Sequence, residues 1–133
     1  MRFLLDTNVC IDMIRGKSDR ILSRLRRCRP GEVGISSITL AELWYGVAKS
    51  RNPEGNAAAL EGFLLPLEAL DFGEAAALAY GAIRATLEKA GTPIGSMDTL
   101  IAAHAVSLGV TLVTSNTREF RRVRPLTVVD WTR

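Results

Sequence analysis

The sequence predicts an α/β fold, a three-layer sandwich in which helices flank a mostly parallel central sheet of about five strands. Short apolar segments suited to buried strands alternate along the chain with longer segments of helical spacing and composition. The chain has 133 residues, 47% hydrophobic and 23% charged, which is enough to bury a core without disulfides or metals. No internal repeat or low-complexity linker interrupts it, so we expect one domain spanning residues 1–133.

The expected strands are short and mostly apolar, as strands buried on both faces of a parallel sheet are. In chain order they cover residues 2–5, 32–36, 67–72, 110–115 and 126–130. In open α/β sheets, ligands bind beyond the carboxyl ends of the strands. The residues that directly follow a strand are therefore the first candidates for a functional site.

Helices are expected between these strands, where apolar residues recur with helical spacing or Ala, Leu and Glu predominate. In chain order they cover residues 9–15, 19–28, 38–49, 54–65, 73–91 and 97–108. We expect Asn8 and Ser96 to cap the first and last helix, because their side chains accept hydrogen bonds from free backbone N–H groups. Gly16, Gly91 and Gly109 follow helical segments, as glycines that end helices do.

The cysteines and the N-terminal segment exclude several classes of protein. Cys10 and Cys28 lie in separate expected helices without a C-x-x-C pair or a Cys/His cluster, so neither a disulfide framework nor a zinc site is expected. The apolar run after Met1 breaks at Asp6, far short of a signal-peptide core or a membrane span. We therefore expect a cytoplasmic protein with no membrane association.

Four acidic residues fall where expected strands end or where the following helices begin. They are Asp6, Glu42, Asp98 and Glu119. Helix N-termini that follow parallel strands point to one edge of the sheet, so we expect these four side chains to meet there. Carboxylate oxygens are the ligands that a hard cation such as Mg²⁺ prefers, so the pattern suits a metal-dependent phosphodiesterase.

Each acid also has a purely structural interpretation. Thr39-x-x-Glu42 fits a capping box, in which Glu42 folds back onto a backbone N–H. Asp98 suits the positive end of a helix, and Asp6 suits a helix cap or turn. Glu119 suits a solvated position within a basic stretch.

The other signals are weaker. The single histidine, His104, lies deep in an expected helix, so we expect it to be packed or hydrogen-bonded rather than catalytic. No G-x-S-x-G, Walker or G-x-G-x-x-G motif is present, which leaves serine-nucleophile, P-loop and dinucleotide functions without support. The net charge is +3, and arginines gather at residues 15–29 and 118–124. Such clusters suit phosphate contacts or, alternatively, a solvated helix face.

Four segments that contain these acids resemble a known family in composition and order. They are FLLDTN (3–8), SSITLAELWYG (36–46), GTPIGSMDTLIAAHA (91–105) and LVTSNTREFRRV (112–123). Together they are similar to the PIN domain and, more narrowly, to the VapC toxins of bacterial VapBC toxin–antitoxin pairs. The resemblance covers essentially the whole chain and implies a PIN-like sandwich.

The resemblance implies an endoribonuclease that depends on Mg²⁺ or Mn²⁺. Asp6 and Asp98 match the family's most characteristic acids and are implied to be the metal ligands, with Glu42 and Glu119 as further catalytic acids. The chain departs from the family at Thr117, where many PIN domains carry an aspartate, so the fourth acid and any second metal are open. The polar residues expected to orient the acids are Thr7, Asn8 and Asn116.

The resemblance also implies partners. The substrate is expected to be structured RNA, such as a tRNA or ribosomal RNA loop, and a VapB-type antitoxin is expected to neutralise the enzyme. A homodimer and a toxin–antitoxin hetero-oligomer are expected, with Trp44 and Tyr45 as candidates for the antitoxin groove. The candidate RNA contacts are Arg118, Arg121 and Arg122.

Three alternatives remain at this point. A PIN-fold binding module without catalysis is compatible with Thr117, and a metal-dependent nuclease acting on DNA would need much the same acids. A receiver-type phosphoacceptor is disfavoured, because Asp6 has no acidic neighbour and no lysine follows Gly91.

Overall fold

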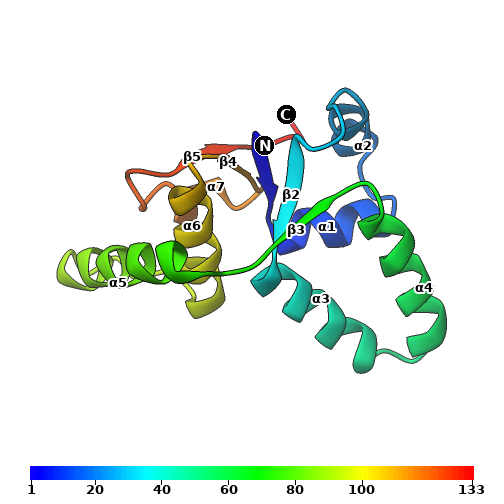
Figure 1. The fold of residues 1–133 in the computed structure, drawn as a ribbon, viewed down its shortest axis with the longest axis horizontal. Coiled ribbons are helices and arrows are strands. Elements are labelled where there is room, and N and C mark those ends of the chain that lie inside the picture. Colours follow the sequence, from blue (N-terminus) through cyan, green and yellow to red (C-terminus); the bar gives the residue numbers. More distant parts are fainter.

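A five-stranded parallel sheet lies at the centre of the molecule, which is described over residues 1–133 by a computed structural model (Figure 1). The strand order is β3-β2-β1-β4-β5, and every neighbouring pair is parallel. The strands are β1 (Phe3–Leu5), β2 (Val33–Ser36), β3 (Glu68–Leu70), β4 (Thr111–Val113) and β5 (Thr127–Val129). The predicted α/β sandwich with about five strands is confirmed.

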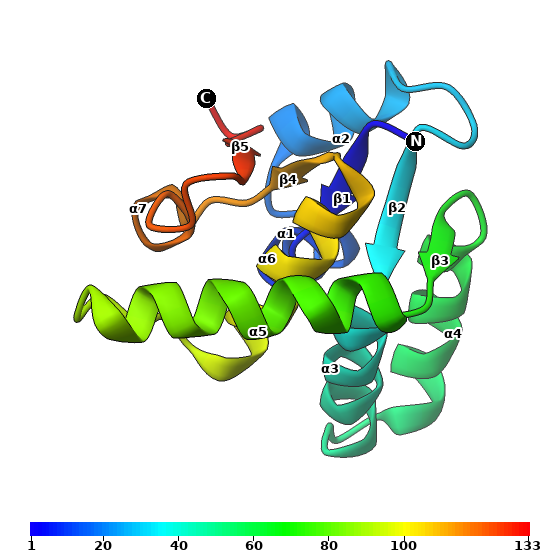
Figure 2. The ribbon, with the colours of Figure 1, turned by 60° about the vertical axis from the view of Figure 1, so that its left-hand side comes forward.

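Helices cover both faces of this sheet (Figures 1 and 2). One face carries α1 (Thr7–Ile14), α2 (Asp19–Arg26), α3 (Ser37–Ala48) and α4 (Pro53–Leu64). The other carries α5 (Glu74–Lys89), α6 (Ser96–Leu108) and α7 (Thr117–Phe120). None of them combines the length and apolar character needed to cross a membrane.

Alternation along the central strands divides the core into two clusters. Leu4 of β1 and Leu112 of β4 pack with α5, α6 and α7, whereas their neighbours Leu5 and Val113 pack with α1, α3 and α4. All four side chains are fully buried, and each such burial contributes roughly 1.5–3 kcal/mol to folding. Adjacent residues therefore fix helices on opposite faces, and this holds the end of β1 firmly in place.

Several expected element boundaries are wrong. Asp6, rather than Asn8, caps α1: its carboxylate accepts from Thr7 N, so the helix begins before Asn8. Gly95, rather than Ser96, is the N-cap of α6, and Ser96 is its first residue. The strands are one to three residues shorter than expected, and Cys28 lies just beyond α2. Helix α7 was not expected, because four residues are too few to show periodicity.

His104 connects α6 to the end of strand β2. Its Nδ1 lies 2.7 Å from Ser36 Oγ at the end of β2, and Phe72 packs edge-on against its ring. Burial lowers the pKa of His104, which favours the neutral ring, while Asp71 opposes that shift. The expectation of a packed, hydrogen-bonded histidine is confirmed.

Candidate active site

Asp6 ends β1 and begins α1. Its backbone N–H donates to Val113 O (2.9 Å), and its carbonyl accepts from Cys10 N (3.2 Å), so the residue completes the sheet and opens the helix. Its carboxylate accepts from Thr7 N and from Thr114 Oγ1, both at 2.8 Å, and is 2% exposed. Burial raises the pKa of Asp6, while the hydrogen bonds from Thr114 and Thr7 oppose that rise. The strand thus presents a carboxylate in a fixed orientation.

Glu42 approaches this carboxylate from α3. Thr7 Oγ1 donates to Glu42 Oε1 at 2.7 Å, and Thr39 Oγ1 lies 3.2 Å from the same hydroxyl. The capping-box interpretation of Thr39 and Glu42 is therefore wrong: Ser36 caps α3, and Glu42 bonds to a side chain of α1. The negative charge of Glu42 adds to the raised pKa of Asp6.

Asp98 lies in the first turn of α6, as expected, and is half-buried. No hydrogen bond holds its carboxylate, although Arg122 Nη1 and Thr99 Oγ1 fix the preceding loop by donating to Pro93 O (3.0 Å) and Gly95 O (2.8 Å). Burial raises the pKa of Asp98 to about 6, and the charges of Asp6, Glu119 and Glu42 add to the rise. This carboxylate is free to reorient on a fixed backbone.

Glu119 comes from α7, beyond β4. Asn116 Nδ2 donates to Glu119 Oε2 at 2.9 Å, and Asn116 N donates to Thr114 Oγ1 at 3.0 Å. Thr114 thereby connects this turn to Asp6. Thr117, the point of departure from the family pattern, is the first residue of α7.

The four predicted acids form one electrostatic unit, which we call the acid site. The charges of Asp6, Glu42 and Glu119 all act on Asp98. The ion pairs of the chain, Arg2–Glu32, Arg84–Glu88 and Arg133–Asp130, involve none of the four. Uncompensated carboxylates at one sheet edge are a donor set that suits a hard divalent cation.

The side chains are not yet arranged as a complete metal-ligand set. No group of three acidic, histidine or cysteine side chains lies close enough together to hold an ion. The chemistry of the donors fits Mg²⁺ or Mn²⁺, because all are carboxylate oxygens and Asp6 retains free lone pairs beside its two hydrogen bonds.

Sequence reasoning did not single out Thr114, which is fully buried against Asp6. The available signal was register: Leu5 pairs with Val113, so the next residues, Asp6 and Thr114, lie side by side. Asn8, in contrast, is exposed and makes no hydrogen bond to an acid, although it was expected to orient them.

The three candidate RNA contacts lie on or just after α7, beside Glu119. Arg118, Arg121 and Arg122 are all exposed. Arg122 is already engaged with the Pro93 carbonyl, so it also has a structural role.

Cys10 lies one turn into α1, behind Asp6. The thiol is fully buried, and burial, followed by the charge of Asp6, raises its pKa far above the usual range. Both cysteines are free thiols, in agreement with expectation.

Comparison with known proteins is consistent along the whole chain. The PIN domain family model matches residues 3–125. The tRNA(fMet)-specific endonuclease VapC of Shigella flexneri is 47% identical over 131 residues, which cover 98% of each chain. Ribonuclease VapC2 of Haemophilus influenzae is 45% identical with the same coverage.

Solved structures show the same similarity. VapBC2 from Rickettsia felis, bound to a DNA fragment from their promoter, contains a chain with a TM-score of 0.94 and 41% identity, covering 98% of this chain and 99% of that one. DNA-bound VapBC from Salmonella typhimurium gives a TM-score of 0.94 at 46% identity, covering 98% of each chain.

Proposed function

Because this chain belongs to the PIN-domain family of VapC endoribonuclease toxins, the toxin half of VapBC toxin–antitoxin pairs, we propose that its substrate is the initiator tRNA. The observation that carries this proposal is the full-length identity of 47% to a relative named as specific for tRNA(fMet). A second relative with that name, from Salmonella typhimurium, is also 47% identical over 98% of both chains.

In the proposed mechanism, Asp6 and Asp98 would hold one Mg²⁺ or Mn²⁺ ion. When bound, such an ion supplies a water of lowered pKa and offsets negative charge that develops on the phosphate. Thr7 and Thr114 hold Glu42 and Asp6 in position by the hydrogen bonds described above. Buried hydrogen bonds of this kind fix the orientation of ligating carboxylates.

The outer acids have a different proposed role. Glu42 and Glu119 accept hydrogen bonds from water around the scissile phosphate and orient the molecule that attacks phosphorus. Attack by water forms a new P–O bond while the bond to the leaving ribose oxygen breaks; the water gives up a proton to solvent, and the leaving oxygen takes one from solvent. Asn116 keeps Glu119 turned towards the acid site through its 2.9 Å hydrogen bond.

The proposed partners follow from the family. A VapB-type antitoxin covers the acid site, and the toxin forms a homodimer within a larger toxin–antitoxin complex in the cytoplasm. Trp44 and Tyr45 on α3 are 39% and 66% exposed, which supports an apolar contact with the antitoxin on this surface. Lys49 Nζ lies 4.9 Å from the centre of the Tyr45 ring and flanks the same surface.

The test is cleavage by purified, antitoxin-free protein. Initiator tRNA, elongator tRNAs, ribosomal RNA and DNA are incubated with wild type or Asp6→Asn, in Mg²⁺, in Mn²⁺ and in EDTA. We expect discrete fragments of the initiator tRNA only from wild type with a divalent ion. Circular dichroism of both proteins controls for folding.

Other outcomes of this experiment separate the alternatives. Cleavage of DNA but not RNA would support the DNA-nuclease alternative. A well-folded wild type that cuts no nucleic acid would support the binding-module alternative, and Thr117 would then be the first position to restore to aspartate. Cleavage of a different RNA would support the proposed ribonuclease activity and contradict only the proposed substrate.

A further inference from the structure

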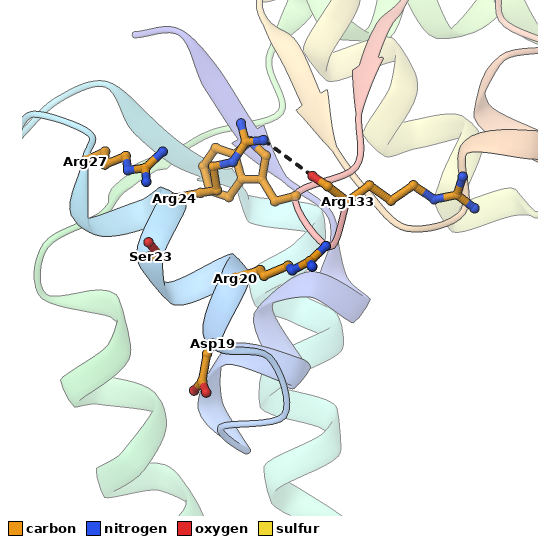
Figure 3. Close-up of a pocket in the computed structure, with 7 residues that line it drawn as sticks. Asp19, Arg20, Ser23, Arg24, Arg27 and Arg133 are labelled. Atoms are coloured by element: carbon orange, nitrogen blue, oxygen red, sulfur yellow. Dashed lines mark hydrogen bonds between the residues drawn. The ribbon is translucent and has the colours of Figure 1, made fainter.

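A cavity of about 420 Å³ lies between α2 and the C-terminal residues (Figure 3). Four arginines line it, and we call it the arginine pocket: Arg20, Arg24, Arg27 and Arg133. The one acidic side chain in its lining is that of Asp19. The mechanism proposed above uses none of these residues.

Helical spacing places three of these arginines on one face of α2. Arg20, Arg24 and Arg27 follow one another at intervals of four and three residues, so they form a row along the helix and are all exposed. Ile21, 1% exposed, anchors the opposite face in the core. Like charges spaced in this way repel one another, although Arg24, in the last turn of α2, also suits the negative end of the helix.

The arginines of the row make no ion pair with an acidic side chain. Arg20 Nη1 donates to Thr132 O (3.2 Å), and Arg24 Nη2 donates to an oxygen of Arg133 (3.4 Å). The fourth lining arginine, Arg133, pairs with Asp130 at 3.8 Å. Arg27 makes no side-chain hydrogen bond, and none of the three takes part in an ion pair. The pocket thus offers guanidinium groups held in place but still able to bind an anion.

The pocket and the acid site lie at different places on the molecule. Asp6 begins α1, which is about 12 Å long by helix geometry and leads to the turn before α2. Figure 1 shows α2 and the C-terminus together at one end of the molecule, away from the junction of β1 and α1. A ligand that fills the pocket therefore does not block the acids.

We propose that the arginine pocket binds the sugar–phosphate backbone of the substrate RNA at a distance from the bond that is cut. This inference rests on the proposed function. Guanidinium groups match phosphate geometry through paired N–H donors, and the row offers three of them in succession along one helix. A protein partner would need an apolar anchor, but the one hydrophobic residue of the lining, Trp131, is 3% exposed and packs on Phe3.

A second phosphate site affects selection of the substrate. An RNA that spans both places gains affinity from the pocket, whereas a short oligonucleotide reaches only the acid site. Phosphate contacts carry no base information, so the pocket favours RNA of sufficient size and shape rather than a sequence.

The test compares two charge-matched double variants. Arg24→Gln/Arg27→Gln removes two charges from the pocket, and Arg51→Gln/Lys89→Gln removes two exposed charges elsewhere that take part in no ion pair. Binding of initiator tRNA and of unstructured oligouridine is measured over a salt series in an Asp98→Asn background. We expect the pocket variant to bind tRNA about tenfold more weakly and to lower the salt dependence by a slope of about 1–2.

Cleavage kinetics give an independent readout. In the otherwise wild-type enzyme, the pocket variant should raise KM for tRNA and leave kcat unchanged, whereas Asp6→Asn should lower kcat. The single variant Arg27→Gln removes a pocket charge without removing a hydrogen bond or an ion pair. It therefore tests the pocket even if the double variant folds poorly.

Three results would overturn the proposal. Equal weakening by both double variants would mean that net charge, and not the pocket, binds RNA. Unchanged binding of tRNA would remove the pocket from recognition. Loss of affinity for the VapB antitoxin with intact RNA binding would assign it to the protein partner. If initiator tRNA is bound but not cut, the proposed substrate fails, while the binding comparison still decides the pocket.

Discussion

The two halves of the acid site are built differently. Asp6 and Glu42 form an anchored half, joined through Thr7, Thr39 and Thr114 by contacts of 2.7–3.2 Å. Asp98 and Glu119 form an adjustable half: one has no hydrogen bond, and the other has a single bond to Asn116.

The difference sets what a bound metal ion would do at the acid site. The anchored half resists movement because its hydrogen bonds are buried. The charges of Asp6, Glu119 and Glu42 add to the raised pKa of Asp98, so a cation bound among the acids would offset the repulsion between the two halves.

The largest effect should come from Asp98, the acid through which the two halves couple. Asp98→Asn keeps the shape of the side chain and removes its charge, so we expect cleavage to fall by about a thousandfold, the scale for loss of one preorganised electrostatic group. Single-turnover cleavage of tRNA measures this. Asp12→Asn on the neighbouring α1 is the control and should cleave at the wild-type rate; a similar loss there would contradict a special role for Asp98.

Divalent cations should stabilise the fold by joining the halves. At a concentration one hundredfold above its Kd, Mg²⁺ should raise the free energy of unfolding by about 2.7 kcal/mol. Denaturant unfolding with Mg²⁺ and with EDTA measures the difference. Asp98→Asn should lose most of it, and an equal gain in that variant would place the ion outside the acid site.

Thr114→Val tests the anchored half. The valine keeps the volume but removes the hydroxyl from Asp6, so we expect a loss of about 1–2 kcal/mol in stability and a fall of about 10–100-fold in activity. Thermal unfolding and initial rates measure these. Thr127→Val, on the exposed edge strand β5, is the matched control. Equal behaviour of the two variants would show that Asp6 does not depend on this hydrogen bond.

The smallest effect should appear in the dependence of stability on pH without divalent ions. The pKa of Asp98 is about 6 in the folded chain, against an ordinary value of 3.8, so the folded chain retains a proton that the unfolded chain releases. The free energy of unfolding should therefore fall as pH rises from about 4 to about 6, by about 1 kcal/mol after allowance for solvent screening. Urea titrations across this range should show a shallower fall for Asp98→Asn.

The sequence predicted where the acids gather but not how each is held. Asp6 and Glu119 were located from strand ends, and Glu42 and Asp98 from the first turns of helices, because in a parallel α/β fold these positions tend to face one edge of the sheet. Thr114 required the register between β1 and β4, which no local pattern reveals. The predicted capping box of Glu42 was wrong for a related reason. A local motif competes with partners from elsewhere in the chain, and Glu42 accepts a hydrogen bond from Thr7 of another helix instead.

The resemblance to the PIN family predicted the activity, which residue patterns alone did not. Strand and helix signals established the sandwich, whereas ribonuclease activity came from four motifs in their characteristic order. Thr117 shows where this reasoning ends. It stands where many PIN domains carry an aspartate, but its position at the start of α7 does not reveal whether catalysis needs an acid there.

The buried thiol of Cys10 offers a way to measure how often the junction of β1 and α1 opens, which is a rate rather than a free energy. A reagent can modify this thiol only when the junction of β1 and α1 opens, because the side chain is fully enclosed behind Asp6. In a Cys28→Ser variant, the rate of modification by a thiol reagent therefore counts those openings. The rate of modification of Cys10 thus reports how often the anchored half opens. Binding of Mg²⁺, tRNA or antitoxin should lower this rate to the extent that each keeps the junction closed.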